Sequence, residues 1–365
     1  MSSTFGRFLK LSLFGESHGV GLGIVIDGLP PGLALDLHEI GREMARRAPG
    51  RSDLSTPRRE DDIPEILSGL YGGKTTGAPL AALIRSLNTR SQDYGEELDM
   101  PRPGHADYTG YVRYGGFGDH RGGGHFSGRL TAPVVFAGAV CKQWLKQNNI
   151  RIYAHIQRLA GLDDGSFLDA RAPADTLSAL KDQTLPVLTP GLAEKMAEAV
   201  LSAKEQSDSV GGVVECMALG LPAGLGAPFF DSAEAVLSHL MFSVPAVKGI
   251  SFGAGFPMAD LRGSQVNDAF YYDEAGAVRT KTNNCGGILG GITDGMPLVF
   301  RCAIRPTSSI ALEQETVSLK EKKNITLQIV GRHDPCIVPR ALPVIEAMTA
   351  IGLCELWKER RSCGI

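Results

Sequence analysis

Three histidines lie in loops bordered by glycine, where a bound molecule could reach the imidazole ring. His18 stands in Gly-Glu-Ser-His-Gly (15–19), His105 in Arg-Pro-Gly-His-Ala-Asp (102–107) and His333 in Gly-Arg-His-Asp-Pro (331–335). Imidazole exchanges a proton near neutral pH because its unperturbed pKa is about 6.5. One such histidine would more often be structural, but three in comparable loops, each near an Arg or a Ser, indicate acid–base chemistry. His38, His155 and His239 are expected to be structural or exposed.

The richest glycine stretch is 115–128, Gly-Gly-Phe-Gly-Asp-His-Arg-Gly-Gly-Gly-His-Phe-Ser-Gly, and it leads into a helix predicted to start near Ser127. Free backbone amides and the positive end of a helix dipole together form an anion site. Arg129 would lie in the first turn of this helix. A second set of glycines and hydroxyls, in 283–295 and 305–309, suits a phosphate ester and the polar edge of a heterocycle.

Arginine outnumbers lysine 24 to 13. The planar guanidinium group matches a phosphate or a carboxylate with two hydrogen bonds at once, so arginines among glycine-rich loops indicate fixed oxyanion groups. The whole chain, with a net charge of −3, offers no general attraction to nucleic acid or to an anionic membrane. We therefore expect a small anionic ligand that is held locally.

Two motifs that usually indicate other chemistries stand in the wrong context. Residues 15–19 match the nucleophile elbow of serine hydrolases, but a helix must follow that elbow, and here an apolar, strand-like run follows over 20–27. Residues 68–75 resemble a phosphate-binding P-loop with Ser68 in place of its first glycine, so 71–77 is better explained as a surface hairpin. No glycine-rich dinucleotide fingerprint follows a predicted strand, and a Rossmann site is not expected.

The composition fits a folded protein of a reducing compartment. The chain has 365 residues, 43% of them apolar, and its 45 glycines have no three-residue period, which excludes collagen and disorder. Seven cysteines without C-x-x-C spacing predict neither a disulfide framework nor a metal site. No apolar run approaches the length of a membrane span. We expect a soluble, cytoplasmic protein.

Helices and short strands are mixed without regular alternation, which favours an α+β fold in a single domain over 1–365. Asp36 and Glu39 form a capping-box pattern that opens a helix through Arg47. Another helix is predicted from Thr189, with Leu192, Met196, Val200 and Leu201 facing the core. Further helices are predicted over 127–148, 231–240 and 340–351, and strands over 8–14, 23–27, 210–218 and 325–330.

The chain contains a weak internal echo. Residues 21–32 resemble 211–224, since each is an apolar run that ends in Gly-Leu-Pro-x-Gly. Any strand-to-turn junction can take this form. The alternative is an internal pseudo-duplication, in which two halves of the fold enclose one site.

In combination, these segments resemble the chorismate synthase family. The similarity runs in order through almost the whole chain, over 15–19, 102–107, the glycine-rich loop with Ser127-Gly-Arg129, 245–249, 286–292, 305–309 and 331–336. Each segment alone is weak, but their joint occurrence by chance is improbable. The resemblance implies a β-α-β sandwich with helices packed between antiparallel sheets, usually assembled as a homotetramer.

The resemblance also implies a reaction. The family converts 5-enolpyruvylshikimate-3-phosphate to chorismate by a 1,4-anti elimination of phosphate, the last shared step toward the aromatic amino acids, and requires reduced FMN without net redox change. The substrate carries roughly four negative charges near neutral pH, which explains the arginines. Two sources of electrons stay open, NADPH used by the chain itself or a separate flavin reductase. The second is expected, because no additional reductase domain is visible.

Carried over position by position, the resemblance implies three catalytic roles. His18, with Ser17 beside it, would protonate or hydrogen-bond the departing phosphate, His105 would face the flavin N1 region, and Asp334 would lie near flavin N5 and relay the C6 proton. The residues expected to bind substrate are Ser17, Arg47, Arg102, Ser127, Arg129 and Arg332. Those expected to line the FMN pocket are His125, Phe126, Ser127, Pro245, Ala246, Gly290, Arg305, Pro306, Thr307, Ser308, Ser309 and Arg332.

The loop before Arg129 departs from the family pattern. It commonly reads Gly-Gly-Arg-Ser-Ser-Ala-Arg, whereas His125 and Phe126 here replace an Arg and a Ser. The alternative function is therefore a non-catalytic flavin or phosphate-ester binding protein, although binding alone would not require His18, His105 and Asp334 together.

Overall fold

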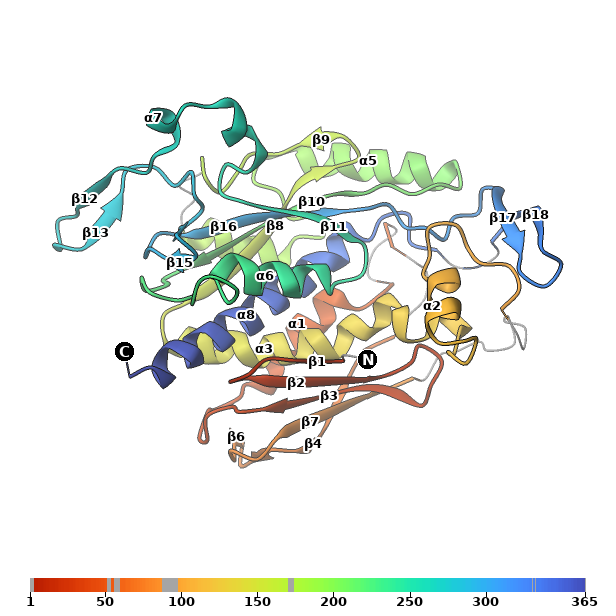
Figure 1. Cartoon of the computed structure of the whole chain (residues 1–365), viewed down its shortest axis with the longest axis horizontal. Coiled ribbons are helices and arrows are strands. Elements are labelled where there is room, and N and C mark those ends of the chain that lie inside the picture. The colour runs from red at the N-terminus through yellow and green to blue at the C-terminus, as the bar shows by residue number, and fades with distance from the viewer. Residues whose placement is uncertain are drawn as a thin grey trace.

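The computed structural model describes residues 3–50, 54–55, 60–86, 98–169, 174–329, 331 and 333–364. In this part of the chain, two five-stranded antiparallel sheets enclose a layer of helices (Figure 1). The first sheet has the order β1 (Thr4–Phe5), β2 (Lys10–Gly15), β3 (Gly21–Asp27), β7 (Leu80–Arg85), β4 (Pro64–Ser68). The second has the order β11 (Val247–Phe252), β16 (Leu298–Ile304), β10 (Gly212–Leu219), β8 (Arg151–Leu159), β9 (Leu162–Asp163). The predicted α+β sandwich is confirmed.

Shorter strand pairs extend from these sheets. They are β5 (Leu70–Tyr71) with β6 (Lys74–Thr75), β12 (Phe270–Tyr272) with β13 (Val278–Thr280), β14 (Ile288–Leu289) with β15 (Ile292–Thr293), and β17 (Gln314–Ser318) with β18 (Lys323–Leu327). The β5–β6 pair confirms that the segment resembling a P-loop is a hairpin.

The helices between the sheets are α1 (Leu37–Arg47), α3 (Thr131–Gln147), α6 (Ala233–Phe242) and α8 (Val338–Ser362) (Figure 1). The remaining α-helices are α2 (Asp107–Arg113), α4 (Ala174–Ala179), α5 (Leu192–Glu205) and α7 (Gly263–Val266). Short 3-10 segments are η2 (Arg121–Phe126), η3 (Gly128–Leu130), η4 (Leu180–Asp182) and η5 (Phe256–Asp260).

The layers pack through apolar side chains on the faces of the strands and through helices that lie in close contact. In β10, Val214 and Cys216 belong to the main core, whereas Met217 belongs to a smaller apolar cluster. α8 contacts β8 and β10, and α3 contacts β3, β7 and α8. α3 and α8 are closely packed at Gly138, where an added Cβ atom would lie 2.2 Å from the Cβ atom of Ala347. A larger residue at position 138 would push these two helices apart.

α1 begins as its sequence predicts. Asp36 is the N-cap and accepts hydrogen bonds from the backbone N–H groups of His38 and Glu39. The return bond of the capping box is replaced, because the N–H of Asp36 donates to Gln143 Oε1 of α3 at 2.8 Å and Glu39 pairs with Lys146. The start of α1 is therefore attached to α3 as well as capped.

Two helices differ from the prediction. α5 begins at Leu192 rather than near Thr189, because Gly191 adopts a left-handed conformation (φ 77°) directly before it. Met196 and Val200 are buried as predicted, but Leu201 is 38% exposed. α8 runs from Val338 to Ser362, well beyond the predicted end at 351, because its middle turns are buried against β8 and β10 of the second sheet and against α3 and α6.

The internal echo coincides with equivalent places in the two sheets. Its segments contain β3 and β10, and each of these is the third of five strands in its sheet. The other predicted strands correspond to β2 and β18, with bounds shifted by three residues or fewer. Both segments therefore form the central strand of a sheet, as an internal pseudo-duplication would require.

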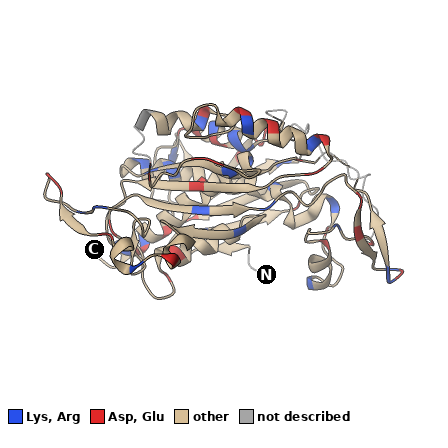
Figure 2. Cartoon of the chain, turned by 90° about the horizontal axis from the view of Figure 1, so that it is seen from above, with Lys and Arg blue, Asp and Glu red and all other residues tan. Residues whose placement is uncertain are grey.

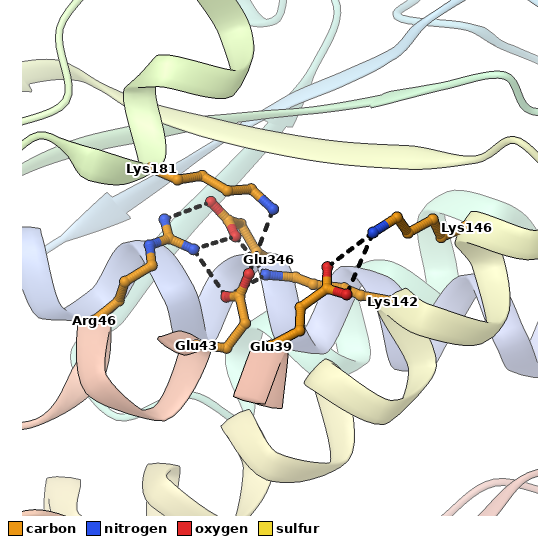
Figure 3. A network of polar contacts seen from close by, with 7 residues as sticks. All are labelled: Glu39, Glu43, Arg46, Lys142, Lys146, Lys181 and Glu346. Carbon is orange, nitrogen blue, oxygen red and sulfur yellow. Dashed lines mark hydrogen bonds and ion pairs between the residues drawn. The ribbon is translucent and has the colours of Figure 1, made fainter. Parts of the chain in front are cut away.

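A network of buried charges joins the helices (Figure 3). Glu346 of α8 accepts hydrogen bonds of 2.7 and 2.9 Å from the guanidinium group of Arg46, and it pairs with Lys142 of α3. Glu43 of α1 binds the same two cations. Burial alone would raise the pKa of Glu346, but the charges of Arg46 and Lys142 lower it to about 2. The network fixes the end of α1 against α3 and α8.

Basic and acidic residues are intermixed on the helices, and few charged residues lie on the long strands of the second sheet (Figure 2). Within the described ranges, no helix is long and apolar enough to cross a membrane.

Candidate active site

A cavity of about 980 Å³ lies among the first sheet, the start of α8 and the loops that follow α6 and β16. Apolar side chains from the sheet and helices line it together with a set of cations. Most of the predicted site residues line this cavity, namely Arg47, Arg102, His105, His125, Phe126, Ser127, Arg129, Pro245, Ala246, Arg305, Pro306, Thr307, Ser308, Ser309 and Asp334.

The glycine-rich loop brings His18 and His105 to one place. Gly122 and Gly123 in η2 both have positive φ. A Cβ atom on Gly122 would lie 2.6 Å from His18 Nε2 and 2.8 Å from Ser17 Oγ, and one on Gly123 would lie 3.2 Å from His105 Nε2. Two adjacent glycines therefore let both imidazoles approach the same loop. Ser17 and His18 do not line the cavity themselves but contact Gly122, which does.

Asp107, the first residue of α2, holds both His105 and Arg102. Its carboxylate accepts a 2.6 Å hydrogen bond from His105 Nδ1 and bonds of 2.7 and 2.8 Å from Nε and Nη2 of Arg102. Burial alone would raise the pKa of Asp107, but these donors hold it well below its usual range. A carboxylate can only accept, so Nδ1 of His105 carries a proton and Nε2 lies toward Gly123.

Arg47 and Arg129 reach the cavity from the end of α1 and from η3. Arg47 donates to Asp62 at 2.6 Å, and Arg129 pairs with Glu60 at 2.9 Å. Arg129 also donates to the carbonyl oxygen of Ser17, so it contacts the turn that carries His18. Both guanidinium groups are more than nine-tenths buried in the cavity wall, where a hydrogen bond to an anion is weakly screened by water.

His333 and Asp334 lie before α8. Asp334 accepts a 2.7 Å hydrogen bond from Arg340, whose Nε donates to the carbonyl oxygen of Arg47 at 3.1 Å. Burial lowers the pKa of His333, so its ring is neutral near pH 7. Nε2 of His333 is buried, with no hydrogen-bond partner among the described residues. This nitrogen can bond to a ligand in the cavity.

The loop after β16 forms another wall. Arg305 donates to the carbonyl oxygen of Gly104 and so joins this loop to the segment of His105. The Thr307 hydroxyl is buried beside the cavity and has no hydrogen-bond partner within the part of the chain that is described. Buried polar atoms are normally satisfied, so Thr307 Oγ1 and His333 Nε2 fit a ligand with a polar edge, as the heterocycle of a flavin has.

The two residues that depart from the family pattern stabilise the glycine-rich loop. His125 Nδ1 donates to the carbonyl oxygen of Gly15 at 2.9 Å, and Nε2 lies 3.1 Å from Ser3 Oγ. Both ring nitrogens are therefore engaged by the protein. Phe126 packs on Gly110, where a Cβ atom would lie 2.7 Å from the ring. His125 and Phe126 therefore present the faces of their rings to the cavity. Neither side chain has a hydrogen-bond donor left for a ligand.

Two predicted positions are not among the residues described as lining the cavity. Gly290 lies in the turn between β14 and β15 and is not among the lining residues, and Arg332 is outside the described residues. His239, expected to be structural or exposed, lines the cavity with its ring 5.6 Å from that of Phe5.

Four charged residues that contact the site were not predicted from the sequence. They are Glu60, Asp62, Asp107 and Arg340. Asp107 stands within the quoted segment 102–107, so its proximity to His105 was a usable signal. The other three are brought to their partners by the fold.

An α+β sandwich with two histidines at one glycine-rich loop and arginines held around a cavity defines an enzyme that acts on a small polyanion. The chorismate synthase family model matches residues 9–357. The chain therefore belongs to the chorismate synthase family, whose members are carbon–oxygen lyases that act on a phosphate ester.

Individual relatives agree. Chorismate synthase of Dehalococcoides mccartyi is 47% identical over 358 residues, covering 98% of this chain and 96% of the relative. Chorismate synthase of Methanocaldococcus jannaschii is 45% identical over 365 aligned positions, with the same coverage. A crystal structure of chorismate synthase superimposes with a TM-score of 0.76 at 31% identity, covering 98% of this chain and 93% of that one.

Proposed function

We propose that this cavity catalyses the 1,4-anti elimination of phosphate from 5-enolpyruvylshikimate-3-phosphate, with reduced FMN bound beside the substrate. The observation that carries the proposal is the approach of His18 and His105 to Gly122 and Gly123 next to the arginine-lined wall. The arginines suit a substrate with one phosphate and two carboxylates. The histidines suit proton movement at the reacting atoms, which binding alone would not need.

We assign substrate binding and proton transfer to different residues of the chain. Arg47, Arg102 and Arg129 bind the anionic groups of the substrate, with Ser127 and Arg332 as further contacts. His18, beside Ser17, donates a proton or a hydrogen bond to the departing phosphate. Asp334 accepts the C6 proton, and its 2.7 Å bond to Arg340 fixes the direction of the carboxylate.

FMN would be held by Thr307, His333 and the neighbouring loops 305–309 and 245–246, with His105 facing its N1 region. Gly290 stays a proposed contact on the family pattern alone. When bound, the reduced flavin would supply electron density to the breaking C–O bond. We assign reduction of the flavin to a separate reductase, and turnover of the purified chain with NADPH and FMN alone would contradict that assignment.

The proposal extends to a homotetramer in the cytoplasm. Phe229 and Phe230 are each 92% exposed and Phe256 is 84% exposed. Large aromatic side chains that are this exposed favour contact with another protein chain. Cross-linking at micromolar concentration tests this assembly, and a strictly monomeric product would contradict it.

Turnover tests the reaction. Protein, dithionite-reduced FMN and substrate are mixed without oxygen, and chorismate absorbance and phosphate release are followed together. Equal amounts of both products are expected. A folded protein that binds FMN but yields neither product would favour the non-catalytic binding protein. A hydrolase would release phosphate without chorismate and would lose activity in Ser17→Ala but not in His105→Ala.

Replacement of either histidine tests its role. His18→Ala and His105→Ala should each slow turnover by about 10- to 10⁴-fold, the usual range for an acid–base group, while FMN still binds. Rates are measured under the same anaerobic conditions, with FMN binding followed by fluorescence. Wild-type rates in either variant would contradict the role assigned to that ring.

A further inference from the structure

Carboxylates lie directly on the arginines of the cavity. The pairs are Asp62 with Arg47, Glu60 with Arg129, and Asp107 with Arg102. In a site that must bind phosphate and carboxylate groups, each of these negative charges repels the ligand. The contacts of Glu60 and Asp62 indicate that these carboxylates fix the orientation of the arginines.

Glu60 and Asp62 belong to one short stretch in front of β4, yet they contact arginines on two different elements, η3 and α1. Their side chains are only 7% and 2% exposed. Ion pairs on a protein surface restrain their side chains only weakly, because water screens the charges and both side chains can still rotate. Buried pairs of this kind fix the side chains that they join.

Asp62 completes the fixation of Arg47. Nη1 of Arg47 donates to Asp62 at 2.6 Å, Nη2 donates to the carbonyl oxygen of Gly128 at 2.8 Å, and Nε donates to Thr131 Oγ1 at 3.1 Å. Each terminal nitrogen carries a second N–H in the same plane, so these three bonds also fix the directions of the remaining N–H groups. Since Arg47 lines the cavity, the carboxylate determines the orientation of a ligand-binding group.

Glu60 plays the same part for Arg129. It lies 2.9 Å from Nε, while Nη1 donates to the carbonyl oxygen of Ser17 and lies 3.3 Å from Ser86 Oγ. The residue after Ser17 is His18. The orientation of Arg129 and the place of the His18 turn therefore depend on one set of contacts.

We propose that Glu60 and Asp62 are positioning residues that orient Arg129 and Arg47 for the anionic groups of the substrate. This inference rests on the proposed function of the cavity. A mobile arginine must lose its rotational freedom when it binds an anion, whereas a fixed guanidinium plane is already oriented. The improved orientation outweighs the repulsion between carboxylate and ligand.

The test uses three variants of the full chain. Asp62→Asn and Glu60→Gln each remove one negative charge and keep the size of the side chain. Glu65→Gln is the matched control, because Glu65 lies in the adjoining strand β4 and pairs with Arg85 at 2.7 Å in an exposed ion pair. For each protein, calorimetry gives the Kd of inorganic phosphate, anaerobic turnover gives KM and kcat, and thermal unfolding gives the Tm.

Positioning predicts that Asp62→Asn and Glu60→Gln raise KM and the phosphate Kd by about 10- to 100-fold, as small displacements of binding groups do, while Glu65→Gln matches wild type. A lower Kd for phosphate would overturn the proposal, because the carboxylates would then only compete with the ligand. Unchanged Kd and KM with a lower Tm would also overturn it, because the role would be purely structural. If Asp62→Asn does not fold, Glu60→Gln decides.

Phosphate binding needs no turnover. A wild-type chain that binds phosphate but makes no chorismate would contradict the proposed function, and the phosphate data would still decide the role of Glu60 and Asp62.

Discussion

The position of the proton on His105 depends on one carboxylate. Asp107 accepts from Nδ1 at 2.6 Å and also binds Arg102 through two bonds. The segment 102–107 contains all three residues, so sequence could place them near one another. Sequence spacing does not reveal which carboxylate oxygen meets which ring nitrogen, because that depends on the turn between Arg102 and the first residue of α2.

Asp107→Asn should therefore impair catalysis. An asparagine side chain can donate to Nδ1 and favour the wrong imidazole tautomer, so we expect kcat to fall by about 10²- to 10⁴-fold. Single-turnover rates and their pH dependence measure the effect. Asp163→Asn serves as the control, since Asp163 pairs with Arg158 on the surface. An unchanged rate and pH profile in Asp107→Asn would show that this carboxylate does not set the tautomer.

At the scale of the elements, α1 carries a binding residue and a structural residue side by side. Arg47 lies in the cavity wall, and Arg46 binds Glu346 of α8 in the buried network (Figure 3). The start of α1 could be predicted because Asp36 bonds to amides two and three residues away. The network could not be predicted, since Arg46 and Glu346 are 300 residues apart.

Glu346→Gln should strongly destabilise the fold. It leaves Arg46 and Lys142 buried with one partner fewer, and breaking a buried ion pair in this way costs about 3–5 kcal/mol in the free energy of unfolding. Urea unfolding followed by circular dichroism measures the change. Glu65→Gln, which breaks an exposed pair, should leave the midpoint unchanged. Equal midpoints for Glu346→Gln and wild type would mean that the network does not stabilise the helix layer.

At the scale of the whole molecule, the second sheet carries its own buried charges. His155 lies opposite Glu215 in the β8–β10 register, at 2.9 Å from its carboxylate, and 3.2 Å from Asp164. Burial alone would lower the pKa of His155, but its hydrogen bonds to Asp164 and Glu215 raise it above 6.5. The histidine was expected to be structural or exposed, and it is structural.

These groups predict a stability that falls at both ends of the pH range. Protonated His155 stabilises the fold fully below pH 6.5, and this contribution is lost as the pH rises through its raised folded-state pKa. Ionised Glu346 stabilises it above pH 4.5, and that contribution is lost as the pH falls toward 2. Tm is measured across this range. His155→Gln should flatten only the alkaline side, and a wild-type Tm that is constant above pH 6.5 would contradict the assignment.

The two-sheet architecture could be predicted in class but not in detail. The echo between 21–32 and 211–224 anticipated strands that lie third in each sheet. The pairing of Glu60 with Arg129 and of Asp62 with Arg47 could not be predicted from the sequence, because the partners lie on different elements. In the sequence, these two acids look the same as acids on the protein surface. Contacts between residues of different layers become evident only when the three-dimensional arrangement of the sheets and helices is known.

A crystal structure with FMN and 5-enolpyruvylshikimate-3-phosphate bound tests the central claim most directly. The flavin should lie in the cavity with His105 beside its ring, and the substrate phosphate should contact His18 while Arg47 and Arg129 bind its anionic groups. Ligands seated elsewhere, for instance in the groove under the β12–β13 hairpin lined by Phe270 and Arg279, would contradict the account.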